Sequence, residues 1–191
     1  DVYPQQKEIT YRTVKKMKEW SGGLYAAHGP LSFYSNKNEN LFGVHNVRDF
    51  CWIGDSLFFV TSGMFGAYLK IHSIPNNELG KRAVMIHNRG SRALALDEIT
   101  KTIYFVSIDG LFKYINGKVS EIKLKGKSIY ANKLLFKNNQ LWIGTVNEGL
   151  YILHHDEIWK HYFHSNLLHG DGVKSFKVLD DFVFVATEEG L

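Results

Sequence analysis

The sequence is poor in the features that mark disulfide-rich, membrane-spanning and disordered proteins. Cys51 is the single cysteine among 191 residues, which excludes an intrachain disulfide and a thiolate zinc site. No apolar run approaches the roughly 18 residues of a membrane-spanning helix, and the first residues lack the basic start and apolar centre of a signal peptide. With 45% hydrophobic and 22% charged residues, the composition is that of a globular domain, and we expect no membrane insertion by this segment.

Cysteine usage leaves the cellular compartment open. A chain without disulfides suits the cytosol, and it also suits an exported domain whose core is large enough without them. Cys51 lies in the apolar run 50–53 and is predicted to be buried and inert.

The basic charge is spread along the chain. The formal net charge is +4 and the isoelectric point is about 9.0, but no block of five or six like charges is present. The densest run is formed by Lys15, Lys16 and Lys18. A nucleic-acid reader usually clusters its cations on one element, so we interpret these lysines as solvated and predict no nucleic-acid partner.

Linear catalytic motifs are missing as well. The sequence contains no Gly-x-Ser-x-Gly elbow, no phosphate-binding glycine loop and no His-Glu-x-x-His. The densest histidine cluster, at residues 154–157, falls on a predicted turn, where we expect neighbouring side chains to point apart. We therefore predict no catalytic residue, no metal and no cofactor, although a linear reading does not reveal an active site assembled from several repeats.

What the sequence does have is one repeated pattern, seen best in "LWIGTVNEGLYIL" at residues 141–153. Weaker copies align on a glycine that follows an apolar run, and the five glycines are Gly29, Gly66, Gly110, Gly149 and Gly190. A period of roughly 40 residues with several short strands in each unit is typical of propeller blades. We expect Gly66, Gly110, Gly149 and Gly190 to permit turns with positive φ, and Trp142 and its counterparts to pack between neighbouring blades.

Each unit divides into short strands. In the fourth unit the apolar and alternating runs predict strands at 131–136, 141–145, 150–153 and 158–163. The third unit repeats this order, with an Asn116-Gly117 hairpin signal. In the first unit, residues 13–17 fit a helical turn by pattern alone, and their place in the period leads us to predict a strand.

The prediction is thus an all-β chain, a β-propeller of four-stranded antiparallel blades with about four and a half blades. The blades are placed at 9–45, 46–90, 91–128 and 129–166, with a partial blade at 167–191. Because the last unit stops after two strands, we expect the chain to be part of a longer protein. Its exposed sheet edge is expected to pair with further strands, with residues 1–8, or with a second copy of the chain.

The fourth unit also carries a family resemblance. Its residues Leu141, Trp142, Ile143, Gly144, Thr145, Gly149, Leu150 and Tyr151 resemble the two-component regulator propeller repeat. A second copy keeps Val173, Phe184, Thr187, Gly190 and Leu191, whereas the second unit has Phe58-Phe59 where the repeat has tryptophan.

The resemblance implies the extracytoplasmic, periplasmic sensor region of a hybrid two-component histidine kinase. It implies a noncatalytic module that responds to an oligosaccharide or another nutrient-derived small molecule, and that signals through a downstream kinase. The alternative is a secreted or cell-surface propeller that serves as an assembly scaffold, or a lyase or hydrolase on the same ring.

Ligand contacts are predicted on the loops at one end of the ring, where propellers usually bind their ligands. The loops 146–148 and 169–172 are expected to lie on this face together with their equivalents in other blades. The candidate residues are Asp109, Asn147, Glu148, His164, His169, Asp171, Glu188 and Glu189. Ordinary solvated loop positions are the alternative interpretation for each of them.

Overall fold

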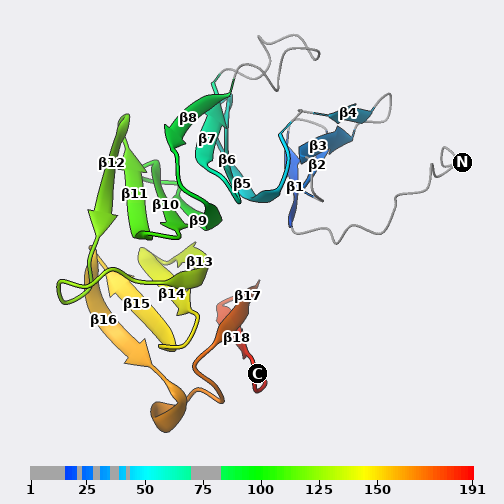
Figure 1. Cartoon of the computed structure of the whole chain (residues 1–191). Helices are drawn as coiled ribbons and strands as arrows, with labels where there is room; N and C mark the ends of the chain where they lie inside the picture. The colour runs from blue at the N-terminus through cyan, green and yellow to red at the C-terminus, as the bar shows by residue number, and fades with distance from the viewer. Residues whose placement is uncertain (1–15, 21–22, 28–30, 35–38, 42–43, 70–82) are drawn as a thin grey trace, which may run out of the picture.

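The computed structural model describes residues 16–20, 23–27, 31–34, 39–41, 44–69 and 83–191. In these parts the chain is built from antiparallel sheets, in which each strand pairs with its neighbour in sequence. The sheets follow one another around an open arc, with the amino-terminal sheet at one end and the carboxyl-terminal pair of strands at the other (Figure 1).

The sheets have the following strands. The first contains β1 (Lys16–Trp20), β2 (Gly23–Ala27), β3 (Leu31–Tyr34) and β4 (Glu39–Leu41). The second contains β5 (Val47–Ile53), β6 (Ser56–Thr61), β7 (Phe65–Tyr68) and β8 (Val84–His87). The third contains β9 (Ser91–Asp97), β10 (Thr102–Ser107), β11 (Gly110–Ile115) and β12 (Lys118–Ile122). The fourth contains β13 (Ala131–Lys137), β14 (Gln140–Thr145), β15 (Leu150–His154) and β16 (Glu157–Tyr162). After the short 3-10 helix η3 (His164–Asn166), β17 (Val173–Leu179) pairs with β18 (Phe182–Thr187).

This arrangement confirms the predicted all-β fold of four-stranded antiparallel blades followed by half a blade. Lys16 and Met17 lie in β1, as the period predicted, whereas residues 13–15 lie outside the described residues. Residues 1–8, considered as a closing strand, and Gly29 also lie outside them.

The first strand of each blade faces the inside of the arc. Among these inner strands β5 lies beside β9, β9 beside β13, and β13 beside β17 (Figure 1). Side-by-side packing of inner strands with outward-running sheets is the arrangement of a propeller. The ends of the inner strands therefore lie together around the axis.

The second strands of the second, third and fourth blades, β6, β10 and β14, are largely buried on both faces because each lies between two neighbouring blades. In β6, Leu57 and Phe59 pack with Phe50 in one cluster, while Phe58 and Val60 pack toward the third blade in another. Such a strand reads as a continuous apolar run instead of an alternating one. Cys51 is 3% exposed, so its predicted burial is confirmed.

Trp142 packs between the fourth sheet and the fifth, in a cluster that includes Ile152, Val173 and Phe176. Tyr104 occupies the corresponding position in β10 and stacks on Phe136 of the next blade, with ring centroids 5.6 Å apart. The aromatic position of the repeat therefore supplies contact area between blades, as predicted.

The prediction of positive φ at a repeat glycine is wrong for Gly66. Gly149 has φ +77°, but Gly66 lies inside β7, opposite Phe59. Because Val60 pairs with Phe65 as Gly144 pairs with Leu150, the residue equivalent to Gly149 is Met64. Gly66 meets a different need, since a Cβ there would lie 3.1 Å from the Phe59 ring and from the Val84 carbonyl oxygen.

The expectation that the side chains at 154–157 point apart is wrong for the two histidines. The rings of His154 and His155 meet edge to face with centroids 4.1 Å apart. His155 and Asp156 both have positive φ, at 51° and 64°, so the chain reverses here in a tight hairpin turn and loses the alternation of a strand. Asp156 forms an ion pair with Lys113 of the preceding blade.

Candidate ligand-binding face

The loop between β16 and β17 is fixed to two neighbouring turns on one end of the ring. The Gly149 amide donates to the Asp171 carbonyl oxygen (2.8 Å), which joins this loop to the β14–β15 turn. The Glu188 amide donates to the Gly172 carbonyl oxygen (2.9 Å), which joins it to the turn after β18. The structure thus brings most of the predicted site residues onto one surface.

The carboxylates of this surface are largely occupied by backbone amides. Asp171 Oδ1 accepts from the His164 amide (2.6 Å), and Glu188 Oε1 accepts from the Gly172 amide (3.1 Å). His164 Nδ1 lies 3.8 Å from Glu189 Oε2 and 3.3 Å from the His169 carbonyl oxygen. Asp171 and Glu188 therefore order the loop that presents the exposed His164 and His169, beside the exposed Glu189 of the turn after β18.

Two other predicted residues lie in the β14–β15 turn. Asn147 is exposed, and Glu148 is anchored by its amide, which donates to Thr145 Oγ1 (2.8 Å). The Glu148 carbonyl oxygen lies 2.7 Å from His161 Nε2, and the His161 ring stacks on Tyr151 with centroids 3.9 Å apart. This turn is braced by the outer strands of its own blade.

Asp109 occupies the equivalent turn one blade earlier and does not reach the His164 loop. Its carboxylate binds the Arg89 guanidinium, with Nε and Oδ2 2.8 Å apart. The hydrogen bond from Arg89 lowers the pKa of Asp109 below its usual range, so the pair carries no net charge at neutral pH.

A second feature of the same face recurs in four blades. In the inner strands β5, β9, β13 and β17 the pairing register shifts around the second residue, so that residue has no direct partner opposite it. Val47 pairs with Thr61 and Asp49 with Val60, which leaves Arg48 between them. The residues in the same position of the next blades are Arg92, Asn132 and Lys174.

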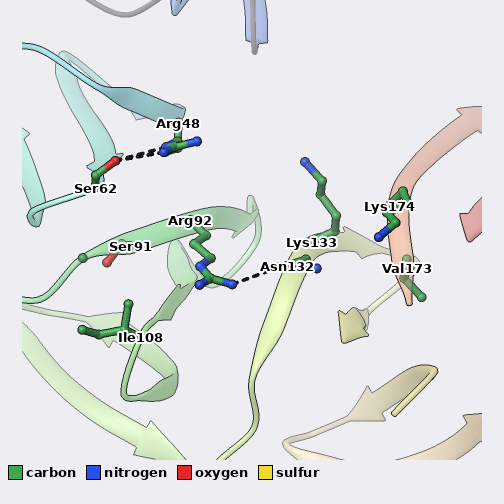
Figure 2. A pocket seen from close by; sticks show the side chains of 10 residues that line it. Arg48, Ser62, Ser91, Arg92, Ile108, Asn132, Lys133, Val173 and Lys174 are labelled. Atoms are coloured by element: carbon green, nitrogen blue, oxygen red, sulfur yellow. Dashed lines mark hydrogen bonds between the residues drawn. The ribbon is translucent and has the colours of Figure 1, made fainter. Parts of the chain in front are cut away.

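A β-bulge of this kind bends the strand and turns its side chain out of the regular alternation. Because the inner strands surround the axis, the four bulge residues all reach the rim of one opening. They line a cavity of about 630 Å³ together with Ser62, Gly90, Ser91, Ile108, Lys133 and Val173 (Figure 2). Cavities of this size are typical of small-molecule sites.

The cavity is strongly basic. Arg48, Arg92, Lys133 and Lys174 line it, and its described lining contains no carboxylate. Glu188 Oε2 lies 3.4 Å from Lys174 Nζ at the edge of the cavity, which connects the cavity to the loop surface around His164. Figure 2 shows the four cationic side chains arranged around one space.

The chemistry of these residues is that of binding. Arginine and lysine supply hydrogen-bond donors and positive charge, and Ser62, Ser91 and Asn132 add neutral polar groups. Among the described residues, no group of three or more histidine, cysteine, aspartate or glutamate side chains is arranged to hold a metal ion.

Sequence reasoning missed the four bulge residues. Their signal is positional, because each follows the first residue of an inner strand at the same point of the period. The cations are separated by about 40 residues along the chain, so a search for charge runs does not detect them.

Comparison with protein-family models and with curated proteins gives no match. Solved structures match at the level of the fold. The extracellular domain of the putative hybrid two-component system BT4673 from B. thetaiotaomicron matches with a TM-score of 0.74 and 18% identity, over 97% of this chain and 27% of that one. PorZ, a bacterial surface component of the type-IX secretion system of Porphyromonas gingivalis, matches with a TM-score of 0.70 and 14% identity, over 98% of this chain and 33% of that one.

The WD40 β-propeller domain of Doa1 matches with a TM-score of 0.63 and 12% identity, over 92% of this chain and 62% of that one. The chain thus spans about a third or less of the length of the first two proteins. At these identities the likeness concerns the fold, and the chain has the fold of a β-propeller. Within the described parts of the chain, no helix has the length and apolar character needed to cross a membrane.

Proposed function

We propose that this chain is a noncatalytic, ligand-sensing propeller from the extracytoplasmic, periplasmic region of a hybrid two-component sensor. One observation carries the proposal. At one end of the propeller, the ordered loop 163–172 lies next to the cavity between the inner strands. The resemblance of residues 141–151 to the two-component regulator repeat supports the signalling role. The fold shared with the extracellular domain of BT4673 supports it as well.

In this proposal the ligand is an oligosaccharide or another nutrient-derived small molecule. It contacts the inner-strand ends of several blades at once, so binding changes the free energy of one arrangement of neighbouring blades relative to another. A sensor needs only such a difference in affinity between two states. A second copy of the chain that contacts one arrangement of the blades better than the other would shift the same equilibrium.

The test is a titration of the protein that contains this chain with a panel of neutral and acidic oligosaccharides, followed by calorimetry. For any saccharide that binds, hydrogen exchange then locates the protected amides. We expect protection in the turns 145–149 and 188–190 and in the loop 163–172. The turns 98–101, 116–117 and 138–139 lie at the opposite end of the third and fourth sheets and serve as the internal control. Silence across the panel, or protection confined to the control turns, contradicts the proposal.

A second candidate function is that of an assembly scaffold, which is favoured by the exposed apolar side chains of the fifth sheet. Leu179 is 57% exposed, Phe182 70% and Phe184 46%. At the position of the fourth sheet that is equivalent to Phe184, Trp142 packs against the following sheet, so in a scaffold these apolar groups would pack against another chain. Self-association that is lost in Phe182→Ser, measured by analytical ultracentrifugation, is the expected result for a scaffold, and a monomer at all concentrations speaks against it.

A further inference from the structure

We infer that the basic cavity is an anion site, and that the ligand of the sensor is an acidic oligosaccharide whose carboxylate or sulfate groups bind Arg48, Arg92 and Lys133. The saccharide class rests on the proposed function, whereas the requirement for negative charge rests on the cavity alone.

Three of the cations that line the cavity have no ion-pair partner among the described residues. Across the described residues, Arg89 is paired with Asp109 and Lys174 with Glu188, but no carboxylate forms an ion pair with Arg48, Arg92 or Lys133. Like charges that line one cavity repel one another, and the repulsion is removed when an anion enters. Solvated surface cations normally spread apart, so their convergence indicates a counter-charge supplied from outside.

Neutral hydrogen-bond partners hold the two guanidinium groups of the cavity in place. Arg48 Nε and Nη2 donate to Ser62 Oγ at 3.2 and 3.1 Å, and Arg92 Nη1 donates to Asn132 Oδ1 at 3.2 Å. A guanidinium has five N–H donors in a rigid fork, so each arginine keeps donors for a carboxylate or a sulfate. Because neutral partners orient them, less conformational entropy is lost when a ligand binds.

The repeated β-bulge also indicates a ligand site. Arg48 and Arg92 occupy the same irregular position of two successive inner strands, and Asn132 and Lys174 occupy it in the next two. Bulges are found beside functional sites, where they turn a side chain toward a ligand. Because the bulge recurs in successive blades, it places hydrogen-bond donors from several strands around one opening.

The lining also narrows the class of anion. The described residues of the lining include no aromatic side chain, so they offer no platform for stacking the bases of a single-stranded nucleic acid. Nucleic-acid readers usually carry their cations in a stripe along one element. The cations of this cavity instead surround an opening. A short, multiply charged saccharide fits both the size of the cavity and the placement of the charges.

The experiment is a calorimetric titration of the protein with an oligogalacturonate, a sulfated disaccharide and a neutral galacto-oligosaccharide of matched length. The first two distinguish carboxylate from sulfate as the source of charge. We expect at least one acidic saccharide to bind and to lose about tenfold or more in affinity in Arg48→Gln/Arg92→Gln, which removes two charge-assisted contacts. The affinity of the wild type should also fall as salt is raised.

The matched control is Lys118→Gln/Lys177→Gln, which removes the same number of charges at exposed positions that do not line the cavity. It should bind the acidic saccharide as the wild type does, and both double variants should keep the wild-type unfolding midpoint. Equal losses in the two variants would indicate nonspecific attraction to a basic protein and overturn the inference. Binding of the neutral saccharide alone would overturn the inference but leave the proposed function standing. Tighter binding of a single-stranded oligonucleotide than of either acidic saccharide would also overturn it.

Discussion

Gly144 and Val173 touch across the boundary between the fourth and fifth sheets, where a Cβ on Gly144 would lie 2.5 Å from Val173 Cγ1. At the previous boundary the sizes are reversed, because Val106 occupies the position of Gly144 and Ala131 that of Val173, within one buried cluster. The repeat thus keeps the volume between blades by pairing one small residue with one larger one. This is the close packing expected of a protein interior.

Gly144→Ala is therefore expected to destabilise the protein by about 1 to 3 kcal/mol, because the added methyl group overpacks the boundary. A second substitution, Val173→Ala, removes Cγ1 but keeps the Cβ of residue 173, which lies 2.8 Å from the Cβ position of residue 144. It should therefore restore part of the lost stability. Urea unfolding of the four proteins of this double-mutant cycle measures the coupling, which should reach about 0.5 kcal/mol or more. Additive effects would show that the two residues are not in contact.

Gly149→Ala should lower the free energy of unfolding by about 2 kcal/mol or more. Gly149 has φ +77°, and a Cβ at this position would lie 2.1 Å from the Tyr162 carbonyl oxygen. Gly117→Ala is the matched control, since Gly117 has φ +81° and nothing lies within 4 Å of its Cβ position. In this control, the free energy of unfolding should fall only by the cost of placing a residue with a Cβ in the left-handed backbone region, roughly 1 to 2 kcal/mol. Thermal and urea unfolding compare the two, and equal losses would contradict the close approach of the loop 163–172 to the β14–β15 turn.

His87 should make stability depend on pH. Its ring packs 4.8 Å from Phe112 and 5.5 Å from Phe105, centroid to centroid. Burial lowers the pKa of His87 below its ordinary value of 6.5, while Asp109 raises it and Arg89 lowers it by smaller amounts. The His87 imidazole therefore binds a proton more readily in the unfolded chain than in the folded protein. The contribution of the neutral ring is present above pH 6.5 and is lost as the pH falls through the lower pKa of the folded state.

The measurement is the free energy of unfolding from pH 8 to pH 5 for the wild type and for His87→Phe. The wild type should lose more stability over this range than the variant. His169→Phe is the control, because His169 is exposed, and it should keep the slope of the wild type. A slope that is unchanged in His87→Phe would show that this ring keeps its ordinary proton affinity.

The blades could be predicted because their signals are local. A strand such as β6, apolar at nearly every position, and a turn such as Asn116-Gly117 carry their own evidence in the sequence. Gly66 was misplaced because the β6–β7 turn of its blade puts Met64 at the repeat position, and only the pairing register reveals this.

The basic cavity could not be predicted for a related reason. Arg48 and Arg92 are ordinary charged residues in the sequence, and a regular strand would place them by simple alternation. The bulges change that placement, and bulges follow from pairing between strands and from contacts between blades. Most of the predicted loop residues lie together on one face, yet Asp171 and Glu188 accept hydrogen bonds from backbone amides, which sequence reasoning cannot assign.

The most direct measurement is a crystal structure of the protein grown with whichever acidic saccharide binds most tightly in solution. The account predicts density for the saccharide between the inner strands, with its anionic groups on Arg48, Arg92 and Lys133. Density only on the outer strand β16, beside the exposed Trp159, would contradict it.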